Sequence, residues 1–473
     1  MTDHVVILGA GLAGLSCGYE LAREGVRVTV LERESHVGGM ASSFVEDGPE
    51  YWSYDLGPHR FHTKDDELIA HVKEILDGNC VDASRLSRIV LYGRFFDYPL
   101  KAGNVVRNLP SRVLVRAFAD YLWVRFTEGI GASHHSDENF EGWVTKRFGK
   151  RLYDLFFGQY TEKAWKMPPA EISGDWASQR ISLLNLSDTV KKALFRPRRG
   201  NTPRTLVTDF IYPGRGGIGE IARGYARKIV AMGGTVATDA PAVKVHLDGT
   251  RVTAVEYGVR ERTLVEGDRY ISTIPVTALA RSVRPAAPPE VREALARLRY
   301  VSIVFVYLKV AKPQVSPDNW VYLPEADVTV HRISEFKNFS PGCAPAGKTM
   351  VCAEITCRNG DEHWRAGDDE LTAIAIRDLE HLGLLRGDEV LGATVKRVPF
   401  AYPVYDLDYK RNLTPVMAFV HSLDNIETGG RQGLFRYNNM DQSIEMGRKM
   451  AWGLLGDERF VHERVATGHE YFG

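Results

Sequence analysis

The sequence predicts an α/β fold in which a domain built on a parallel sheet is interrupted by a second domain of mixed α+β character. The first fifty residues pass through an apolar run, a glycine-rich turn, a helical pattern and a second apolar run, which is typical of a βαβ unit. After a long helical stretch, strand and helix patterns of this kind return from about residue 205. A chain of 473 residues with 44% hydrophobic content is long enough for two or three domains.

Composition excludes several classes of function. Lys+Arg and Asp+Glu number 60 each, so no net charge favours nucleic acid as a partner. The five cysteines are scattered without a CxxC pair, which argues against a disulfide framework and a thiolate zinc site and favours the cytoplasm. The N-terminus lacks the basic region of a signal peptide, and no run approaches the roughly 20 apolar residues of a membrane span. We therefore expect a cytoplasmic protein without a membrane span.

The βαβ unit carries the most specific motif in the chain. The apolar run Val5 to Leu8 predicts a buried strand, GxGxxG follows it, and a helical pattern leads to a second strand that ends at Glu32. Such a turn brings helix N–H groups to a pyrophosphate, and the acid accepts a ribose hydroxyl, so we expect a Rossmann-like dinucleotide site. The alternative is a glycine turn that serves helix packing alone. The expected contacts here are Gly9, Gly11, Leu12, Ala13, Gly14, Glu32 and Arg33.

The segment after Glu32 indicates which dinucleotide binds. "ERESHVGGMASSF" resembles the second glycine-rich turn of FAD-binding proteins of the glutathione-reductase type, which implies FAD as the cofactor. Many such proteins have arginine directly after the glycine pair, whereas this chain has Met40. The expected contacts are Gly39, Met40 and Ala41.

The rest of the chain divides by pattern. Residues from about 64 to 200 have helical periodicity, and β-rich segments follow from about 205. We expect a discontinuous FAD-binding domain of residues 1–75, 205–290 and 395–473. A helical insert, 76–204, and a β-rich segment, 291–394, would form the substrate domain.

A basic run, residues 191–204, stands apart as a loop marked by prolines and glycine. It is either a solvated surface loop or a lid that meets an anionic substrate.

Five further segments, in order along the chain, resemble those of UDP-galactopyranose mutases, within the wider group related to amine and protoporphyrinogen oxidases. They are "DLGPHRFHT", "LYDLFFGQYTEKAW", "HRISEFKNF", "AYPVYD" and "GRQGLFRYNNMDQSI". The resemblance implies that Trp165 lines a sugar pocket and that Arg332 and Tyr402 contact a substrate diphosphate. It also implies a C-terminal flavin-binding turn and helix. The cofactor contacts expected in the later part of the chain are Val243, Arg431, Asn439, Met440 and Ser443.

The same residues have physical interpretations of their own. Arg332 lies among β-branched residues that predict a buried strand, where it needs either a phosphate or carboxylate ligand or a structural ion pair. Trp165 and Tyr402 are core aromatics if they do not touch substrate. In the last segment, Asn438, Asn439 or Asp441 can cap a helix whose N–H groups would face an electron-rich flavin carbonyl.

The chain departs from the mutase pattern in the diphosphate clamp. "SQRISLLN" places Leu184 where the mutases have a second clamp arginine, with Arg180 matching an earlier arginine, and "AEIT" replaces a tyrosine-bearing segment. Arg94 or the basic run would have to supply the missing charge, or the substrate is not a nucleotide sugar.

The segment "YDLGPHRFHT" contains His59, Arg60 and His62, which we expect to act at the site together with Trp165, Arg332 and Tyr402. A metal site is not expected, because Gly57 and Pro58 predict a loop and no carboxylate or cysteine motif completes a ligand set. The histidines either pack structurally or lie against the flavin ring, where His59 would contact the cofactor. Arg60 replaces a residue that is apolar in the mutase motif.

Three functions remain open. The leading hypothesis is an FAD-dependent enzyme acting on a sugar or nucleotide-sugar ring, by mutase-like chemistry with reduced flavin as nucleophile or by redox chemistry. The second is an oxidase or desaturase whose apolar pocket is lined by aromatic residues of the helical insert, among them Tyr121, Trp123 and Phe126. The third is a non-catalytic nucleotide-binding scaffold. The expected binding partner is a small molecule. A homodimer is the oligomeric state left open.

Overall fold

The computed structural model describes residues 3–131, 135–180, 209–456 and 462–465. The chain forms two compact units, each assembled from separate stretches of sequence. The first unit comprises residues 1–83, 210–299 and 409–471, and the second comprises residues 84–209 and 300–408, together with 472–473.

The first unit is built on a parallel sheet of five strands in the order β20-β13-β1-β2-β9. Strand β1 is the central strand, and its five residues are all buried. This is expected because the inner strands of a parallel sheet are covered on both faces. The strands are β1 (His4–Leu8), β2 (Arg27–Leu31), β9 (Thr235–Ala237), β13 (Arg269–Ser272) and β20 (Ile426–Thr428). The helices of this unit are α1 (Leu12–Arg23), α2 (Asp66–Ile75), α10 (Glu220–Ala231), α11 (Val276–Ser282), α12 (Pro289–Arg297), α15 (Tyr409–His421), α16 (Gly430–Gly433) and α17 (Met440–Leu454).

Two smaller sheets complete the first unit. One has the order β12-β11-β10-β14 and the other pairs β3 with β4. Their strands are β3 (Ser43–Asp47), β4 (Tyr51–Asp55), β10 (Ala242–Asp248), β11 (Arg251–Tyr257), β12 (Thr263–Val265) and β14 (Val283–Arg284). A further pair, β5 (Val81–Ser84) with β8 (Asp209–Tyr212), is formed by the chain segments in which the sequence passes from one unit to the other.

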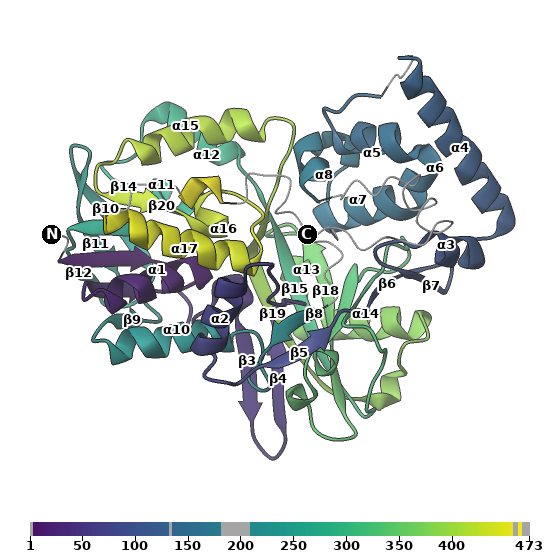
Figure 1. Ribbon diagram of the computed structural model, residues 1–473, viewed down its shortest axis with the longest axis horizontal. Helices are drawn as coiled ribbons and strands as arrows, with labels where there is room; N and C mark the ends of the chain where they lie inside the picture. The colour runs from purple at the N-terminus through teal and green to yellow at the C-terminus, as the bar shows by residue number, and fades with distance from the viewer. Residues whose placement is uncertain (1–2, 132–134, 181–208, 457–461, 466–473) are drawn as a thin grey trace. The chain divides into compact units, whose positions relative to one another are not determined.

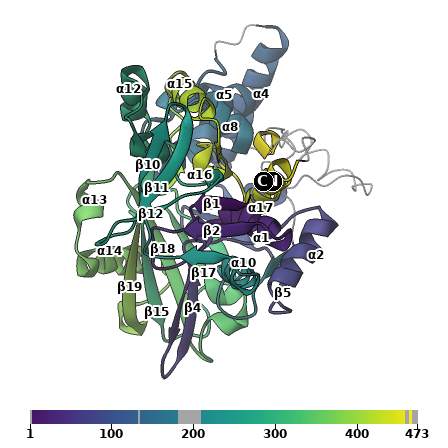
Figure 2. The same ribbon diagram turned by 90° about the vertical axis from the view of Figure 1, so that its left-hand side faces the viewer.

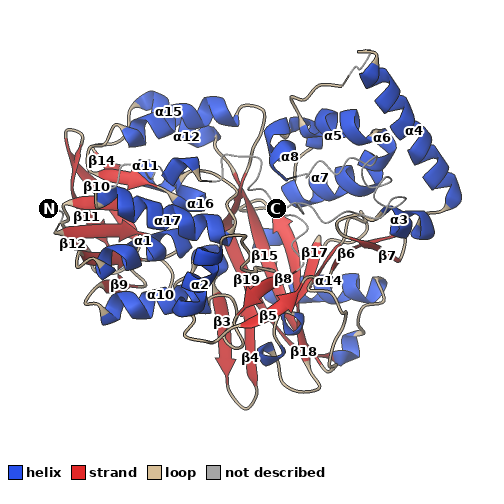
Figure 3. Cartoon of the chain, viewed as in Figure 1, coloured by secondary structure: helices blue, strands red, loops and turns tan. Residues whose placement is uncertain are grey.

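The second unit contains a sheet of seven strands in the order β19-β15-β18-β17-β16-β6-β7, whose long strands are drawn in red in Figure 3. The strands are β6 (Ser87–Leu91), β7 (Arg94–Asp97), β15 (Tyr300–Val310), β16 (Trp320–Tyr322), β17 (Arg332–Glu335), β18 (Thr349–Cys357) and β19 (Val390–Pro403). Helix α14 (Asp368–His381) joins the core of this sheet through Leu371, Ala375 and Leu379. A short helix, α13 (Glu362–Arg365), precedes it.

The remaining helices of the second unit form a separate group. They are α3 (Ala102–Asn108), α4 (Ser111–Gly129), α5 (Phe140–Phe148), α6 (Lys150–Leu152), a π-helical turn (Tyr153–Gly158), α7 (Gln159–Trp165) and α8 (Gly174–Arg180). Across the described residues, no helix has both the length and the apolar character needed to cross a membrane.

The expectation of continuous helical structure from about residue 64 is wrong for residues 81–97, which contain three strands. Strands β6 and β7 pair around Tyr92 and Gly93, whose φ angles of 55° and 64° are both positive. Such a two-residue turn joins antiparallel strands tightly. This hairpin is rich in β-branched and aromatic residues, which favour strands. It was not predicted because the sequence on either side of it has helical periodicity.

Candidate functional site

The first glycine turn depends on the absence of side chains at Gly9 and Gly14. Gly9 has φ +101°, and a Cβ on Gly14 would lie 2.1 Å from the Gly9 carbonyl oxygen. A Cβ on Gly11 would meet nothing within 4 Å, so this side of the turn is open to a ligand. The first turn of α1, including Leu12 and Ala13, is buried directly behind it.

Glu32 lies at the end of β2 with its carboxylate directed to that turn. Its Oε2 accepts a hydrogen bond from the Ala10 N–H at 2.8 Å, and its Oε1 accepts one from the Glu34 N–H at 3.0 Å. The predicted acid is therefore held beside the glycine turn. Arg33, in contrast, is exposed and forms an ion pair of 2.7 Å with Glu34.

The second glycine turn lies against the first. The Gly38 N–H donates to the Ala10 carbonyl at 2.8 Å, and a Cβ on Gly39 would lie 3.5 Å from the Gly11 Cα. Met40 is half-buried and Ala41 is buried, and both belong to the single 3₁₀ turn Gly39–Ala41. The close approach of two glycine turns leaves backbone, without side chains, facing the open side of Gly11.

Helix α17 brings the C-terminal motif to the same region, as its position beside α1 in Figures 1 and 2 shows. A Cβ on Gly447 would lie 2.1 Å from the Ala13 carbonyl oxygen, and the Ser16 hydroxyl donates to the Ile444 carbonyl at 3.1 Å. A buried ion pair of 2.9 Å between Arg448 and Glu20 adds to this packing. The two helices therefore approach through small residues.

The N-terminus of α17 begins at Met440, with Asn439 as its N-cap residue. The Gln442 side chain accepts the Asn439 N–H at 2.8 Å, and the Ser443 hydroxyl donates to the Asn439 carbonyl at 2.9 Å. The first N–H groups of any helix lack partners within it, and they carry its positive dipole end. Of the three candidate caps in the sequence, the structure uses Asn439.

Gly430 and Arg431 lie between β20 and this helix. Gly430 has φ +76°, and a Cβ there would lie 3.0 Å from the Ala13 Cβ. The Arg431 guanidinium donates to the Asn438 carbonyl at 2.8 Å and lies 5.4 Å from the centre of the Tyr437 ring. Val243 is half-buried in β10 of the same unit.

These features fit a flavin dinucleotide. Both glycine turns and Gly430 pack at the N-terminal end of α1, so segments more than 400 residues apart in sequence meet there. Gly11 offers an open backbone to a pyrophosphate, Glu32 can accept a ribose hydroxyl, and the N-terminus of α17 presents the positive end of its dipole.

The segment with His59, Arg60 and His62 belongs to the first unit. It follows β4, and Phe61 exchanges backbone hydrogen bonds of 3.3 and 2.9 Å with Ile211. The three polar side chains are half-buried, and the Arg60 guanidinium lies 5.9 Å from the centre of the Phe210 ring. The loop is therefore anchored in the middle by backbone pairing.

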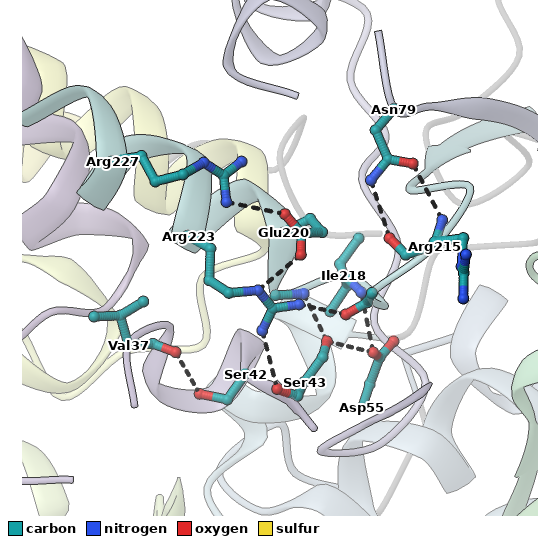
Figure 4. A network of polar contacts seen from close by, with 12 residues as sticks. Val37, Ser42, Ser43, Asp55, Asn79, Arg215, Ile218, Glu220, Arg223 and Arg227 are labelled. Carbon is teal, nitrogen blue, oxygen red and sulfur yellow. Dashed lines mark hydrogen bonds and ion pairs between the residues drawn. The ribbon is translucent and has the colours of Figure 1, made fainter. Parts of the chain in front are cut away.

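Asp55, immediately before this loop, is the centre of the polar network in Figure 4. Its carboxylate accepts hydrogen bonds from the Ser43 hydroxyl at 2.6 Å, the Ile218 N–H at 3.0 Å and the Tyr212 hydroxyl at 2.7 Å. Arg223 adds a bond of 3.1 Å to the Ser43 carbonyl. Burial raises the pKa of Asp55 to about 6, against the opposing effect of these donors.

In the second unit, Arg332 is paired with a residue that the sequence analysis did not select. Glu354 lies directly opposite it on β18 and accepts two hydrogen bonds, 2.7 Å from Nε and 2.6 Å from Nη2. Burial alone would lower the pKa of Arg332, but Glu354 together with Tyr402 and Tyr160 outweighs it and holds that pKa well above its ordinary value. The expected anion-binding cation is thus engaged in an internal, bidentate ion pair.

Aromatic side chains surround this ion pair. Tyr322 is opposite Arg332 on β16, and its ring centre lies 5.4 Å from that of Tyr160. Trp165, at the end of α7, is buried with its ring centre 5.9 Å from that of Tyr402. Burial also raises the pKa of the Tyr160 hydroxyl well above its ordinary value, so it stays protonated.

His331 completes the polar cluster of the second unit. Its Nδ1 lies 2.8 Å from the Glu354 carbonyl oxygen, which can only accept, so Nδ1 carries the proton. Burial, aided by the neighbouring Arg332, lowers the pKa of His331 well below its usual value. The imidazole is therefore neutral at neutral pH.

The positions of several other residues named in the sequence analysis can be compared with the structure. Leu184 and the basic run 191–204 lie outside the described residues, and Arg180 is the last residue of α8. Trp123 and Phe126 are exposed on α4 instead of lining a pocket, whereas Tyr121 is buried. Within the described ranges, no group of three or more His, Cys, Asp or Glu side chains could hold a metal ion.

Residues 12–405 match the model of a protein family described as flavin containing amine oxidoreductase. The chain belongs to this family and is a flavin-dependent enzyme with FAD as its cofactor.

The individual relatives include both a sugar mutase and an amino-acid oxidase. A probable UDP-galactopyranose mutase of Klebsiella pneumoniae is 24% identical over 201 residues, which are 42% of this chain and 51% of that protein. An L-amino-acid oxidase of Naja atra is 24% identical over 321 residues, or 65% of this chain and 59% of the other. The match thus spans only about half of these relatives' length.

A crystal structure of reduced UDP-galactopyranose mutase has the same fold. Its TM-score is 0.83 at 22% identity, and the superposition covers 99% of this chain and 97% of that one.

The sequence contained a partial signal for the residues that were missed. Glu354 is the single charged residue in the strand "TMVCAEITC", whose other residues are apolar apart from two threonines. A buried carboxylate requires a cation, and Arg332 was the matching arginine in a strand of similar character. What the sequence lacked was the register that places them opposite each other.

Proposed function

We propose that this FAD-dependent enzyme acts on a sugar or nucleotide-sugar ring. The observation that carries the proposal is the cluster in the second unit, where Arg332 and Glu354 lie among Tyr160, Tyr322 and Tyr402. Aromatic faces suit the C–H surface of a sugar ring, and a paired acid and guanidinium offer acceptors and donors for its hydroxyls. The mutase relatives support the same substrate class.

FAD supplies either a nucleophile in its reduced state or a hydride acceptor in its oxidised state. The chain's own residues would bind and orient the substrate. Trp165 and Tyr402 would pack against the ring, and the spare N–H groups of Arg332 would donate to hydroxyl or phosphate oxygens. His331, neutral and with its Nδ1 proton donated to a carbonyl, would keep the strand end rigid.

We also propose that the segment His59 to His62 contacts the cofactor, with Arg60 as a further cation for an anionic part of the substrate. A cytoplasmic location remains part of the proposal, supported by five free cysteines, four of them buried.

A second candidate function is oxidation of an amine or amino acid, and one observation favours it. Because Glu354 already neutralises Arg332, a diphosphate would have to compete with a buried carboxylate for that guanidinium. A substrate without phosphate avoids this competition.

One experiment separates the two. The FAD-loaded protein, reduced under anaerobic conditions, is incubated with UDP-galactopyranose and other nucleotide sugars, and furanose products are sought by chromatography. In parallel, the oxidised protein is tested in air for hydrogen peroxide with amines, amino acids and sugars. Furanose formation, or peroxide with sugars, supports the proposal. Peroxide with amines or amino acids alone rejects it in favour of the second candidate.

A further inference from the structure

Exposed apolar side chains are concentrated in one part of the second unit. Of the eighteen large apolar residues that are exposed in the described residues, ten lie between Leu86 and Ile130. Five of them are on helix α4, and we call Val115, Phe118, Leu122, Trp123 and Phe126 the α4 face. Trp123 is 65% exposed and Val115 is 67% exposed.

Helix α4 is apolar on two opposite sides. Its inner side is buried through Ala117, Tyr121 and Val124, as expected for a helix that packs on its neighbours. Figures 1 and 3 show α4 at the outer edge of the helical group formed by α5 to α8. Val115, Phe118, Leu122 and Phe126 follow one another at helical spacing, so they form a continuous stripe on its outer side.

The charges around this stripe are almost all positive. At roughly 100° per residue, Arg125 falls on one side of the stripe and Arg112 and Arg116 on the other. These three arginines are exposed and make no ion pair with any described residue. The two acids of α4, Asp120 and Glu128, are half-buried instead of exposed beside the stripe. Asp120 accepts the Arg151 N–H at 2.8 Å.

The imbalance extends beyond the helix. Residues 85–130 contain eight Lys or Arg and three Asp or Glu, in a chain whose formal net charge is zero. A helix with Trp, Phe and Leu on its exposed side, flanked by arginines, is the pattern of helices that lie in the plane of a membrane interface. A bilayer with anionic headgroups complements both the apolar stripe and the positive charge.

We propose that the α4 face docks this enzyme onto the surface of an anionic phospholipid bilayer. A second copy of the chain fits the same face less well, because a two-fold contact would bring Arg112, Arg116 and Arg125 of both copies together. The inference is independent of the substrate proposed above, since no α4 residue belongs to the polar cluster around Arg332.

The test is flotation of the FAD-loaded protein with vesicles. Vesicles of phosphatidylcholine with about one-third phosphatidylglycerol should bind the protein at about 0.1 M salt, and binding should weaken at about 0.5 M. Pure phosphatidylcholine vesicles should bind it far less. Each arginine contributes about fivefold to the partition coefficient, so R112Q, R116Q and R125Q combined should lower it about a hundredfold.

Apolar variants provide the second arm. Phe118→Ser with Leu122→Ser should lose vesicle binding, whereas Leu264→Ser, at an exposed site on β12, should not. Flavin absorbance per protein reports that each variant is folded. Should the apolar double variant fail to fold, the arginine variant still tests the proposal, because it leaves the stripe intact.

Three results would overturn it. The first is absence of binding to the anionic vesicles, and the second is binding that none of the α4 variants reduces. The third is a dimer in light scattering that Phe118→Ser with Leu122→Ser dissociates, in a protein that does not bind vesicles. That outcome would assign the α4 face to contact between copies of the chain.

Discussion

Arg332 on β17 and Glu354 on β18 form a bidentate ion pair, with Nε–Oε1 and Nη2–Oε2 distances of 2.7 and 2.6 Å. Glu354 is completely buried, and the Arg332 side chain is 17% exposed. The pair therefore has a structural role, whatever it also does for a substrate. Any phosphate or hydroxyl that approaches Arg332 meets a guanidinium whose main donors are already engaged.

Glu354→Gln should destabilise the enzyme by about 3 kcal/mol, because it leaves the Arg332 charge unpaired in a largely buried site. Urea unfolding of the FAD-loaded protein measures this loss. Arg332→Gln combined with Glu354→Gln should recover part of it, since no charge is then left behind. Asp368→Asn, which removes a partly exposed ion pair with Arg397, is the matched control and should cost less. Equal effects of the two single variants would contradict the interpretation.

Gly11→Ala should weaken FAD binding about tenfold or more while leaving the apoprotein as stable as the wild type. Gly11 has φ −73° and ψ 173°, and its added Cβ meets nothing within 4 Å, so only a bound ligand is obstructed. Titration of apoprotein with FAD, followed by flavin fluorescence, gives the affinity. Gly367→Ala is the control, because Gly367 is also a helix N-cap with extended backbone and open space around it. Unchanged FAD affinity in Gly11→Ala would place the pyrophosphate elsewhere.

Asp55 should make the stability of the enzyme fall as pH rises through about 6. Its pKa is about 6 in the folded state against 3.8 when unfolded, so the folded state binds the proton more tightly, and this contribution is full below about pH 4. Between about pH 4.5 and 7, wild type should lose roughly 2 kcal/mol relative to Asp55→Asn. Urea unfolding across that range measures the difference.

The control for Asp55 is Asp239→Asn, at an exposed position of the same unit, which should keep the wild-type pH profile. A profile of Asp55→Asn parallel to that of wild type would show that the carboxylate is charged throughout.

Tyr402→Phe should raise KM for the substrate about tenfold while FAD content stays unchanged, if its hydroxyl donates to a charged substrate oxygen. Steady-state kinetics of the reaction found by the furanose and peroxide assays measures KM and kcat separately. Tyr405→Phe, a buried tyrosine three residues along the chain, is the matched control. A fall in kcat without a change in KM would assign Tyr402 to the chemical step instead of binding.

The first glycine turn, the acid at Glu32 and the helix between them were predictable because their geometry is local. Backbone spacing within about thirty residues decides which N–H groups face a pyrophosphate, so the motif contains its own structure. The family resemblance extended this to the cofactor and to the C-terminal helix, whose cap the sequence left among three candidates.

Other features depended on which strands pair and in which register. The hairpin of β6 and β7 was missed because the patterns on both sides of it are helical. Glu354 became significant only through the strand register that places it opposite Arg332. The burial of the aromatic residues of α4 could not be predicted either. Periodicity identifies an apolar helix but does not say which of its sides is covered by other residues.

By itself, the sequence determined a dinucleotide-binding α/β unit, because the geometry of that unit is local, and the resemblance of its ordered motifs to a known family predicted a flavin enzyme. The tertiary structure decided that Arg332 is paired with Glu354, that Asp55 is buried among three donors and that α4 keeps an apolar side exposed. The physical reason is that burial and pairing are properties of neighbours in space, and the spacing of residues along the sequence does not say which segments become neighbours.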